Sequence, residues 1–283
     1  MGKIILSAFA DEYNPELNKQ IEVLREHGVP MIEPRFIDGK NISDFTEEEA
    51  KELRAVLDKN GIKVSAIGSP IGKIELDEDF DAHLEKAERT FKCANILGAK
   101  NIRMFSFRLK DGERREDVRD EVIRRLTLLL DLADKYGVTL CHENEAKIYG
   151  ETVEYALDLL EHFGGRLKAV FDMGNFVLEG SKPYPYGLDK LKNHIEYFHI
   201  KDGLAAGAVV PPGVGEAHIE EILKAYKSEF DRDFIITLEP HLETFSGLNS
   251  LAGKHFENPY KYESPELAFL DALKRIKEII ARV

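Results

Sequence analysis

The sequence has little cysteine, no tryptophan and no long uninterrupted hydrophobic run. Its two cysteines, Cys93 and Cys141, could form one bridge at most, so the chain is not a disulfide-stapled scaffold. No stretch approaches the roughly 18 consecutive apolar residues that a membrane-spanning helix requires. The apolar run Ile4–Ala8 is too short for a signal peptide, and we therefore expect a cytoplasmic protein.

Basic residues are also in short supply, with 39 Lys and Arg against 52 Asp and Glu, which gives a formal net charge of −13. Tight binding to nucleic acid or to an anionic membrane depends on Lys and Arg that neutralise phosphates, so neither partner is expected. A chain of 283 residues, 43% of them hydrophobic, is long enough to bury a sizeable core.

Short β-branched runs alternate throughout the chain with longer segments whose apolar residues recur at three- and four-residue spacing. The predicted strands are Ile4–Ala8, Met31–Glu33, Lys63–Ile67, Asn101–Phe105, Val138–Cys141, Leu167–Phe171, Ile195–Ile200 and Phe234–Leu238. The predicted helices are Pro15–His27, Thr46–Lys59, Phe80–Leu97, Glu116–Tyr136, Thr152–His162, Gly187–Asn193, His218–Ser228 and Pro265–Arg282.

Eight strand–helix units in series favour an α/β fold, a single (β/α)8 TIM barrel that spans residues 1–283 as one domain. The alternative is an open doubly wound sheet, which usually has fewer strands and a glycine-rich first turn. The first turn here, Ser7–Asp11, contains no glycine. The barrel is therefore the better interpretation.

Two connections are long for such a protein, Ser69–Asp79 after the third strand and the segment His241–Ser264 after the eighth. Both follow the carboxyl end of a strand, which is the face of a barrel where active sites are built. We expect them to be lids or pocket walls, and simple surface insertions are the alternative.

Acidic and imidazole side chains stand at the carboxyl ends of the last four predicted strands: Glu143, Asp172, His199 and Glu239. In a barrel these ends meet at one rim, so the four side chains should converge. Three close carboxylates repel one another unless a cation compensates them. One imidazole with three carboxylates suits one divalent ion, such as Mn²⁺, Co²⁺, Zn²⁺ or Mg²⁺.

The segments around these residues resemble the sugar phosphate isomerase/epimerase family, the xylose isomerase-like TIM barrels. The resemblance covers nearly the whole chain and rests on Leu140–Glu145, Phe171–Phe176, Tyr197–Asp202 and Leu238–His241, with Glu33–Arg35, Gly39–Asn41 and Pro212–Glu216 in addition. It implies that Glu143, Asp172, His199 and Glu239 are the metal ligands.

In this family the glutamates that correspond to Glu143 and Glu239 face each other across the bound sugar, where one removes a proton beside the carbonyl and the other returns one. A ketose that chelates a divalent ion has an acidified α C–H, and the ion stabilises the enediolate that follows. A carboxylate on each face then permits proton transfer with inversion.

Further residues are predicted near the site. Lys201 would stabilise an enediolate oxygen or hold a substrate oxygen, with an ion pair to Asp202 as the alternative. Arg35 would bind the substrate or pair with Glu33. The other candidate substrate contacts, any of which could instead have a supporting structural role, are Arg103, His142 and His241.

The predicted function is therefore a metal-dependent isomerase or epimerase of a small sugar, keto-sugar or sugar phosphate. An inosose-type dehydratase would use the same site, because the enediolate can expel a β-hydroxyl. An AP endonuclease is less favoured, since the predicted strands one to four end without the extra histidines of that branch. A non-catalytic sugar-binding barrel is a further alternative. The sequence does not decide the sugar, and a homo-oligomer is possible.

Overall fold

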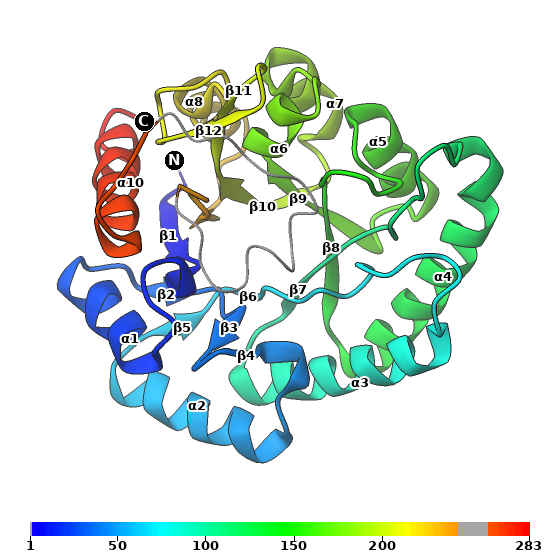
Figure 1. The fold of residues 1–283 in the computed structure, drawn as a ribbon, viewed down its shortest axis with the longest axis horizontal. Helices are drawn as coiled ribbons and strands as arrows, with labels where there is room; N and C mark the ends of the chain where they lie inside the picture. The colour runs from blue at the N-terminus through cyan, green and yellow to red at the C-terminus, as the bar shows by residue number, and fades with distance from the viewer. Residues whose placement is uncertain (1, 243–259) are drawn as a thin grey trace.

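A computed structural model describes residues 2–242 and 260–283 of the chain, and its centre is a curled parallel sheet (Figure 1). The strands follow the order β1-β13-β10-β9-β8-β7-β6. Their bounds are Ile4–Ala8 for β1, Ala66–Ile67 for β6, Asn101–Met104 for β7, Thr139–Glu143 for β8, Leu167–Asp172 for β9, Ile195–Ile200 for β10 and Phe234–Leu238 for β13.

A second parallel pair fills the gap between β1 and β6. It consists of β2 (Met31–Ile32) and β5 (Lys63–Val64). The Glu33 amide donates to the Ala8 carbonyl at 3.1 Å, and the Ser65 amide donates to the Ile32 carbonyl at 2.9 Å. These bonds connect β1 to β2 and β2 to the third strand, so the barrel closes and the predicted (β/α)8 fold is confirmed.

Helices surround the barrel, as Figure 1 shows, and their positions agree with the predicted segments to within a few residues. The bounds are Leu17–Glu26 for α1, Glu47–Lys59 for α2, Phe80–Leu97 for α3, Arg115–Tyr136 for α4, Val153–His162 for α5, Ile219–Glu229 for α8 and Pro265–Ile280 for α10. Thr46 and Glu49 form a capping box at the start of α2, and Ser264 caps α10.

Several predicted segments were wrong in their extent. The predicted strand Lys63–Ile67 is divided at Ser65, because β5 pairs with β2 before this residue and β6 pairs with β7 after it. The predicted strand Val138–Cys141 continues to Glu143. The predicted helix Gly187–Asn193 contains only the four-residue α7 (Leu188–Leu191), which follows a wide turn η3 over Pro183–Gly187.

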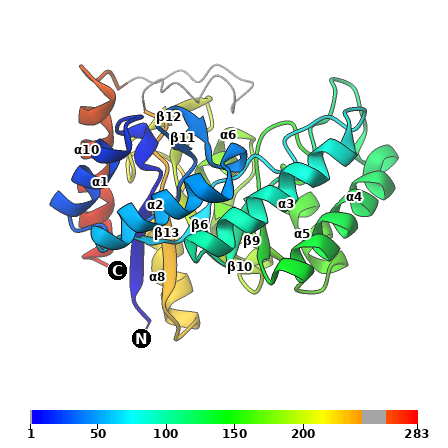
Figure 2. The same cartoon turned by 90° about the horizontal axis from the view of Figure 1, so that it is seen from below.

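The sequence patterns missed some short elements altogether. These are the helix α6 (Met173–Leu178), the 3-10 turns η1 (Ala10–Glu12) and η2 (Ile42–Asp44), and two hairpins, β3–β4 (Phe36–Ile37 and Lys40–Asn41) and β11–β12 (Asp202–Leu204 and Ala208–Val210). In the side view of Figure 2, β1 runs from the N terminus toward the end of the barrel where the β11–β12 hairpin lies. These elements follow strands β1, β2, β9 and β10 and thus belong to the rim at their carboxyl ends.

The long connection Ser69–Asp79 is fixed against its neighbours. The amides of Phe105 and Arg108 donate to the carbonyls of Ile71 and Ile74, both at 2.8 Å. Gly72 has a φ of +84°, and a Cβ there would lie 1.9 Å from the Phe105 carbonyl oxygen, so only glycine fits this close approach. Most of the second long connection, residues 243–259, lies outside the described residues.

Candidate functional site

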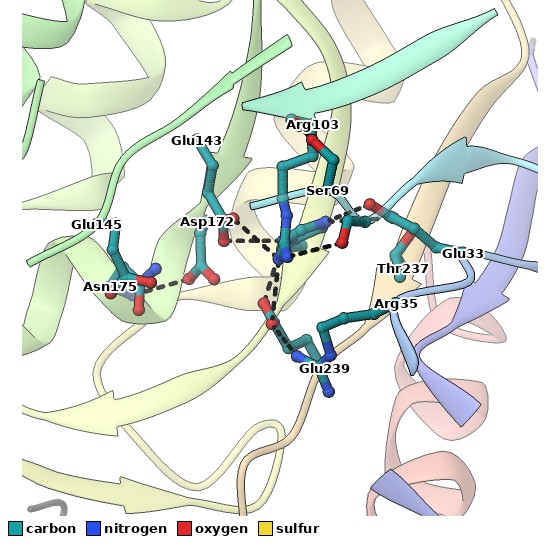
Figure 3. Close-up of polar contacts among 12 residues, drawn as sticks. Glu33, Arg35, Ser69, Arg103, Glu143, Glu145, Asp172, Asn175, Thr237 and Glu239 are labelled. Carbon is teal, nitrogen blue, oxygen red and sulfur yellow. Dashed lines mark hydrogen bonds and ion pairs between the residues drawn. The ribbon is translucent and has the colours of Figure 1, made fainter. Parts of the chain in front are cut away.

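The carboxyl ends of four adjacent barrel strands bring together Glu143 from β8, Asp172 from β9, His199 from β10 and Glu239, which follows β13. All four are buried, and one ligand atom from each lies within 4.8 Å of the others. Figure 3 shows the carboxylates of Glu143, Asp172 and Glu239 directed toward the same small region. The convergence expected from the sequence is therefore present.

His199 stands at the centre of this group. Its Nδ1 lies 2.9 Å from Glu143 Oε1 and 3.1 Å from Glu239 Oε2. Burial by itself lowers the pKa of His199, but the negative charges of Glu143, Glu33 and Glu239 outweigh it and raise the pKa well above 6.5. Without an ion, a cationic imidazole thus compensates part of the carboxylate charge.

Lys201 and Arg103 supply further positive charge beside the cluster. Lys201 Nζ lies 3.1 Å from Asp172 Oδ2 and 3.4 Å from Glu239 Oε2. Arg103 Nη1 lies 3.2 Å from Glu143 Oε2. The alternative pair between Lys201 and Asp202 is wrong, because the Asp202 carboxylate accepts four backbone N–H groups, those of Gly203, Gly213, Gly215 and Ala217.

Arg35 is fully buried and holds three carboxylates, none of which is Glu33. Its guanidinium lies 2.9 Å from Asp11 Oδ2, 3.2 Å from Glu12 Oε1 and 2.9 Å from Glu239 Oε1. The sequence-based alternative of an Arg35–Glu33 pair named the wrong partner, since Asp11 and Glu12 belong to the turn η1 that the strand–helix pattern did not reveal. Arg35 therefore fixes one oxygen of Glu239 and leaves the other directed at His199.

The ligand carboxylates differ in their proton affinity. Burial raises the pKa of Glu143, but the charges of His199 and Arg103 overcome this effect and lower the pKa to about 2. Burial raises the pKa of Asp172 to about 7 although Lys201 opposes it. The pKa of Glu239 falls well below its usual value, because Lys201, His241 and His199 more than offset its burial. Both glutamates are therefore ionised at neutral pH.

Two asparagines orient Asp172. The side chain of Asn144 donates to the Asp172 carbonyl at 2.8 Å and accepts the Asp172 amide at 3.0 Å. Asp172 Oδ1 accepts the Asn175 amide at 2.8 Å, which caps α6. Oδ2 is thus directed toward Lys201 and the shared region. Neither asparagine was predicted as a site residue, because Asn144 reaches Asp172 across two loops and the Asn175 contact belongs to the start of α6, a helix that the sequence patterns missed.

The two histidines predicted as substrate contacts have different partners. His142 Nε2 bonds to Ser106 Oγ at 2.9 Å, and burial lowers the pKa of His142 to about 4. His241 Nε2 lies 3.3 Å from Glu239 Oε1 and 3.4 Å from Glu12 Oε1. His241 thus touches a candidate ligand directly, whereas His142 supports the rim, and a substrate role for either one stays a prediction.

Glu33 is a buried carboxylate that was not predicted as a site residue, as are Asp11 and Glu12 beside Arg35. It follows β2, and its Oε2 lies 3.2 Å from His199 Nε2. The available signal was the same one that identified the four ligands, an acidic residue at the end of an apolar strand. The strand before Glu33 is short, and the nearby Arg35 offered an ion-pair partner, so Glu33 was not assigned to the site.

The donor set fits a divalent cation. Glu143 Oε2 and Glu239 Oε2 are buried and accept no well-directed hydrogen bond from the part of the chain that the structure describes, although Arg103 Nη1 lies 3.2 Å from the first oxygen and His199 Nδ1 lies 3.1 Å from the second. Buried oxygens of this kind normally have a partner. Three carboxylates and an imidazole form a mixed oxygen and nitrogen set that suits Mn²⁺, Co²⁺, Zn²⁺ or Mg²⁺ and leaves positions for water or substrate.

A closed parallel barrel whose carboxyl rim carries three carboxylates and a histidine is typical of TIM barrels with a candidate metal site. Comparison with known families agrees, because the chain matches the family described as "Xylose isomerase-like TIM barrel" over residues 21–278. The chain therefore belongs to the xylose isomerase-like TIM barrel family.

Individual relatives are more distant. The chain is 27% identical over 100 residues to the 2-oxo-tetronate isomerase of Haemophilus influenzae, a match that covers 32% of this chain and 38% of that protein's length. The probable 3-DHS dehydratase AsbF of Bacillus anthracis has a similar fold, with a TM-score of 0.73 at 18% identity over 98% of this chain and 99% of that one. The IOLI protein with a bound zinc atom has the same TM-score and identity, over 99% of this chain and 98% of that one.

No helix in the described ranges is long and apolar enough to cross a membrane.

Proposed function

We propose that this protein is a divalent-metal-dependent isomerase or epimerase that acts on a small sugar, keto-sugar or sugar phosphate. The observation that carries the proposal is the convergence of Glu143 and Glu239 on one His199 nitrogen, at 2.9 and 3.1 Å, from strands on different sides of β10. With Asp172 they form a four-residue donor set whose ligand atoms lie within 4.8 Å of one another. The set combines a candidate ion site with two ionised glutamates.

In the proposed mechanism, a divalent ion held by Glu143, Asp172, His199 and Glu239 would polarise the substrate carbonyl and stabilise the enediolate charge. The ionised carboxylate of Glu143 or Glu239 would take the α proton, and the other glutamate, after it has taken a proton from water, would return one on the opposite face. Arg35 holds Glu239 Oε1 at 2.9 Å, so the reactive Oε2 keeps its direction. Lys201 and Arg103 lie beside these glutamates, where each can donate to a substrate oxygen.

The match to 2-oxo-tetronate isomerase supports an isomerisation, and the zinc-containing neighbour supports a divalent ion. A dehydratase is the second candidate, because a structural neighbour is a probable 3-DHS dehydratase and because the same proton abstraction can lead to loss of a β-hydroxyl. An AP endonuclease and a non-catalytic sugar-binding barrel are less well supported, since the net charge of −13 disfavours DNA and since two glutamates converge on one candidate ion site, as proton transfer requires.

The Glu239→Gln substitution tests the proposed function. We expect the rate of solvent-deuterium incorporation at the substrate α carbon to fall by about 10²–10⁴-fold, because an amide cannot take or return the proton. The substrate comes from a panel of ketoses, ketose phosphates and inososes incubated with the Mn²⁺-loaded wild type, with products identified by NMR. A product that has lost one water relative to the substrate would indicate a dehydratase instead.

A matched control is Glu196→Gln, the same chemical change on β10 at the opposite end of the strand from His199. Glu196 accepts from Asn101 Nδ2 at 3.4 Å and is remote from the cluster, so deuterium incorporation should stay within about twofold of the wild type. Unchanged exchange in Glu239→Gln would exclude the proposed proton transfer.

A further inference from the structure

We propose that Glu33 is a positioning residue that fixes the tautomer and the ring orientation of His199, so that the Nδ1 lone pair faces the ion. This inference rests on the proposed metal centre and concerns how the chain prepares one of its ligands. Glu33 does not touch the shared region itself. It acts through the far nitrogen of the imidazole ring.

The contacts of Glu33 define this role. Its carboxylate is 0% exposed and lies 3.2 Å (Oε2) and 3.4 Å (Oε1) from His199 Nε2. Thr237 Oγ1 donates to Oε2 at 2.7 Å, and Tyr197 OH donates to Oε1 at 3.0 Å. Figure 3 shows Glu33 and Thr237 on one side of the cluster and Glu143 on the other.

The charge of Glu33 has one ion-pair partner among the residues that the structure describes, and that partner is His199. A buried carboxylate is costly unless a cation or several hydrogen bonds compensate it. Two hydroxyl donors and an imidazole N–H satisfy Glu33, and they come from β13 and β10, which lie two and three strands away from β2 around the barrel. The buried charge of Glu33 therefore depends on His199 for its compensation.

The consequence for the metal centre follows from the chemistry of imidazole. A neutral ring carries its proton on one nitrogen and offers a lone pair on the other. A carboxylate at Nε2 keeps the proton there, so Nδ1 is the atom that stays available as a ligand. This is the atom that faces Glu143 and Glu239. The carboxylate also raises the basicity of the ring and hence its strength as a ligand.

Ring packing supports the same orientation. Phe9 meets the His199 ring edge-on with centroids 5.1 Å apart, and the Tyr197 ring lies 5.5 Å away. These contacts restrict the tilt of the imidazole but do not distinguish its two nitrogens. Glu33 supplies that distinction.

The test compares Mn²⁺ binding by calorimetry in the wild type, Glu33→Gln and Glu33→Met. Gln keeps an acceptor without the charge, whereas Met removes both and retains the side-chain length. We expect Kd to rise about 10-fold in Glu33→Gln and about 100-fold in Glu33→Met, the range seen for groups that orient metal-bound histidines. The control Glu196→Gln, at the opposite end of the barrel, should leave Kd unchanged.

A second readout separates positioning from a merely structural role. In the Cu²⁺-loaded protein, pulsed EPR detects the remote nitrogen of a coordinated imidazole, and its quadrupole coupling depends on the hydrogen bond at that nitrogen. We expect this coupling to change in both Glu33 variants and to be unaltered in the control. A contribution of Glu33 to folding alone would lower the melting temperature and leave the coupling as in the wild type.

The outcomes are distinguishable. Wild-type Kd and coupling in both Glu33 variants would overturn the inference and leave the proposed function intact. Tight Mn²⁺ binding with the expected Kd series, but without turnover of any panel substrate, would support the inference and count against the proposed function. A wild type that binds no Mn²⁺ would remove the metal centre and this inference together.

Discussion

At the residue scale, the site is a network in which each cation touches carboxylates from different strands. Arg35 contacts three of them, Arg103 contacts Glu143 and Glu239, and Lys201 contacts Asp172 and Glu239. Buried ions cost free energy individually and are tolerated when their partners are complete. Removal of one partner should therefore lower the free energy of unfolding by far more than the contribution of an exposed ion pair.

Lys201→Met tests this statement. The substitution leaves the buried Asp172 and Glu239 carboxylates without a cation at 3.1 and 3.4 Å, so we expect the free energy of unfolding of the ion-free protein to fall by about 3–5 kcal/mol. Urea unfolding measures this. Addition of Mn²⁺ should recover more stability in the variant than in the wild type, because the ion replaces the missing charge.

The control is Lys192→Met, a lysine whose side chain is 25% exposed and pairs with the exposed Glu229 at 2.8 Å. Such a pair contributes about 0–1 kcal/mol, so the loss should stay in that range. Equal losses in Lys192→Met and Lys201→Met would contradict the importance of the buried network.

At the element scale, the rim depends on loops that are fixed to the helices behind them. The connection 69–79 is attached to α3 through His83, whose Nε2 accepts the Gly72 amide at 2.8 Å. The sequence predicted the long loop but not its attachment, because the loop and the histidine ring meet only after α3 has packed on the barrel. Burial lowers the pKa of His83 to about 4, so the ring is neutral and able to accept.

This attachment predicts a pH dependence. The pKa of His83 is about 4 in the native state and about 6.5 in the unfolded chain, so between these values the unfolded chain binds the extra proton. Stability should therefore decrease as the pH falls from 6.5 to 4, by about 3 kcal/mol from His83 at the lower limit. Burial also lowers the pKa of His142 and His241 to about 4, which adds to the same trend.

The variant His83→Gln can accept the same bond without a titration. Urea unfolding at pH 7 and pH 4.5 should show a difference about 2–3 kcal/mol smaller in His83→Gln than in the wild type. A difference as large as that of the wild type would show that other groups cause the acid sensitivity.

At the scale of the whole molecule, the barrel concentrates acidic side chains at one end. Six buried carboxylates lie in this cluster, from Asp11, Glu12, Glu33, Glu143, Asp172 and Glu239. Three permanent cations accompany them, those of Arg35, Arg103 and Lys201. Acid groups therefore outnumber these cations in the described cluster, and a bound divalent ion would compensate some of the remaining carboxylates.

Removal of the ion should thus destabilise the entire fold. An ion that binds only the native state stabilises it by about 2.7 kcal/mol at 100 times its Kd, which corresponds to several degrees in Tm for a chain of this size. We expect chelator-treated protein to melt at a lower temperature and Mn²⁺ to restore the original value. The variant Asp172→Asn, which loses a candidate ligand, should respond far less, and an identical response would argue against the ion site.

The sequence by itself determined the alternation of strands and helices and the positions of Glu143, Asp172, His199 and Glu239 at strand ends. Both follow from local information, namely the period of apolar residues and the residue at which each apolar run stops. A parallel barrel then places all strand ends at one rim, so those four residues could be predicted to converge without any knowledge of side-chain contacts.

Only the tertiary structure decided which groups orient these residues. Glu33 and His199 are 166 residues apart, and Arg35 and Glu239 are 204 apart. No local pattern specifies such pairs, because they depend on the register between strands and on where each rim loop turns. The same reason explains the errors over Ser65 and α7, where tertiary hydrogen bonds and packing overrode the local sequence signals.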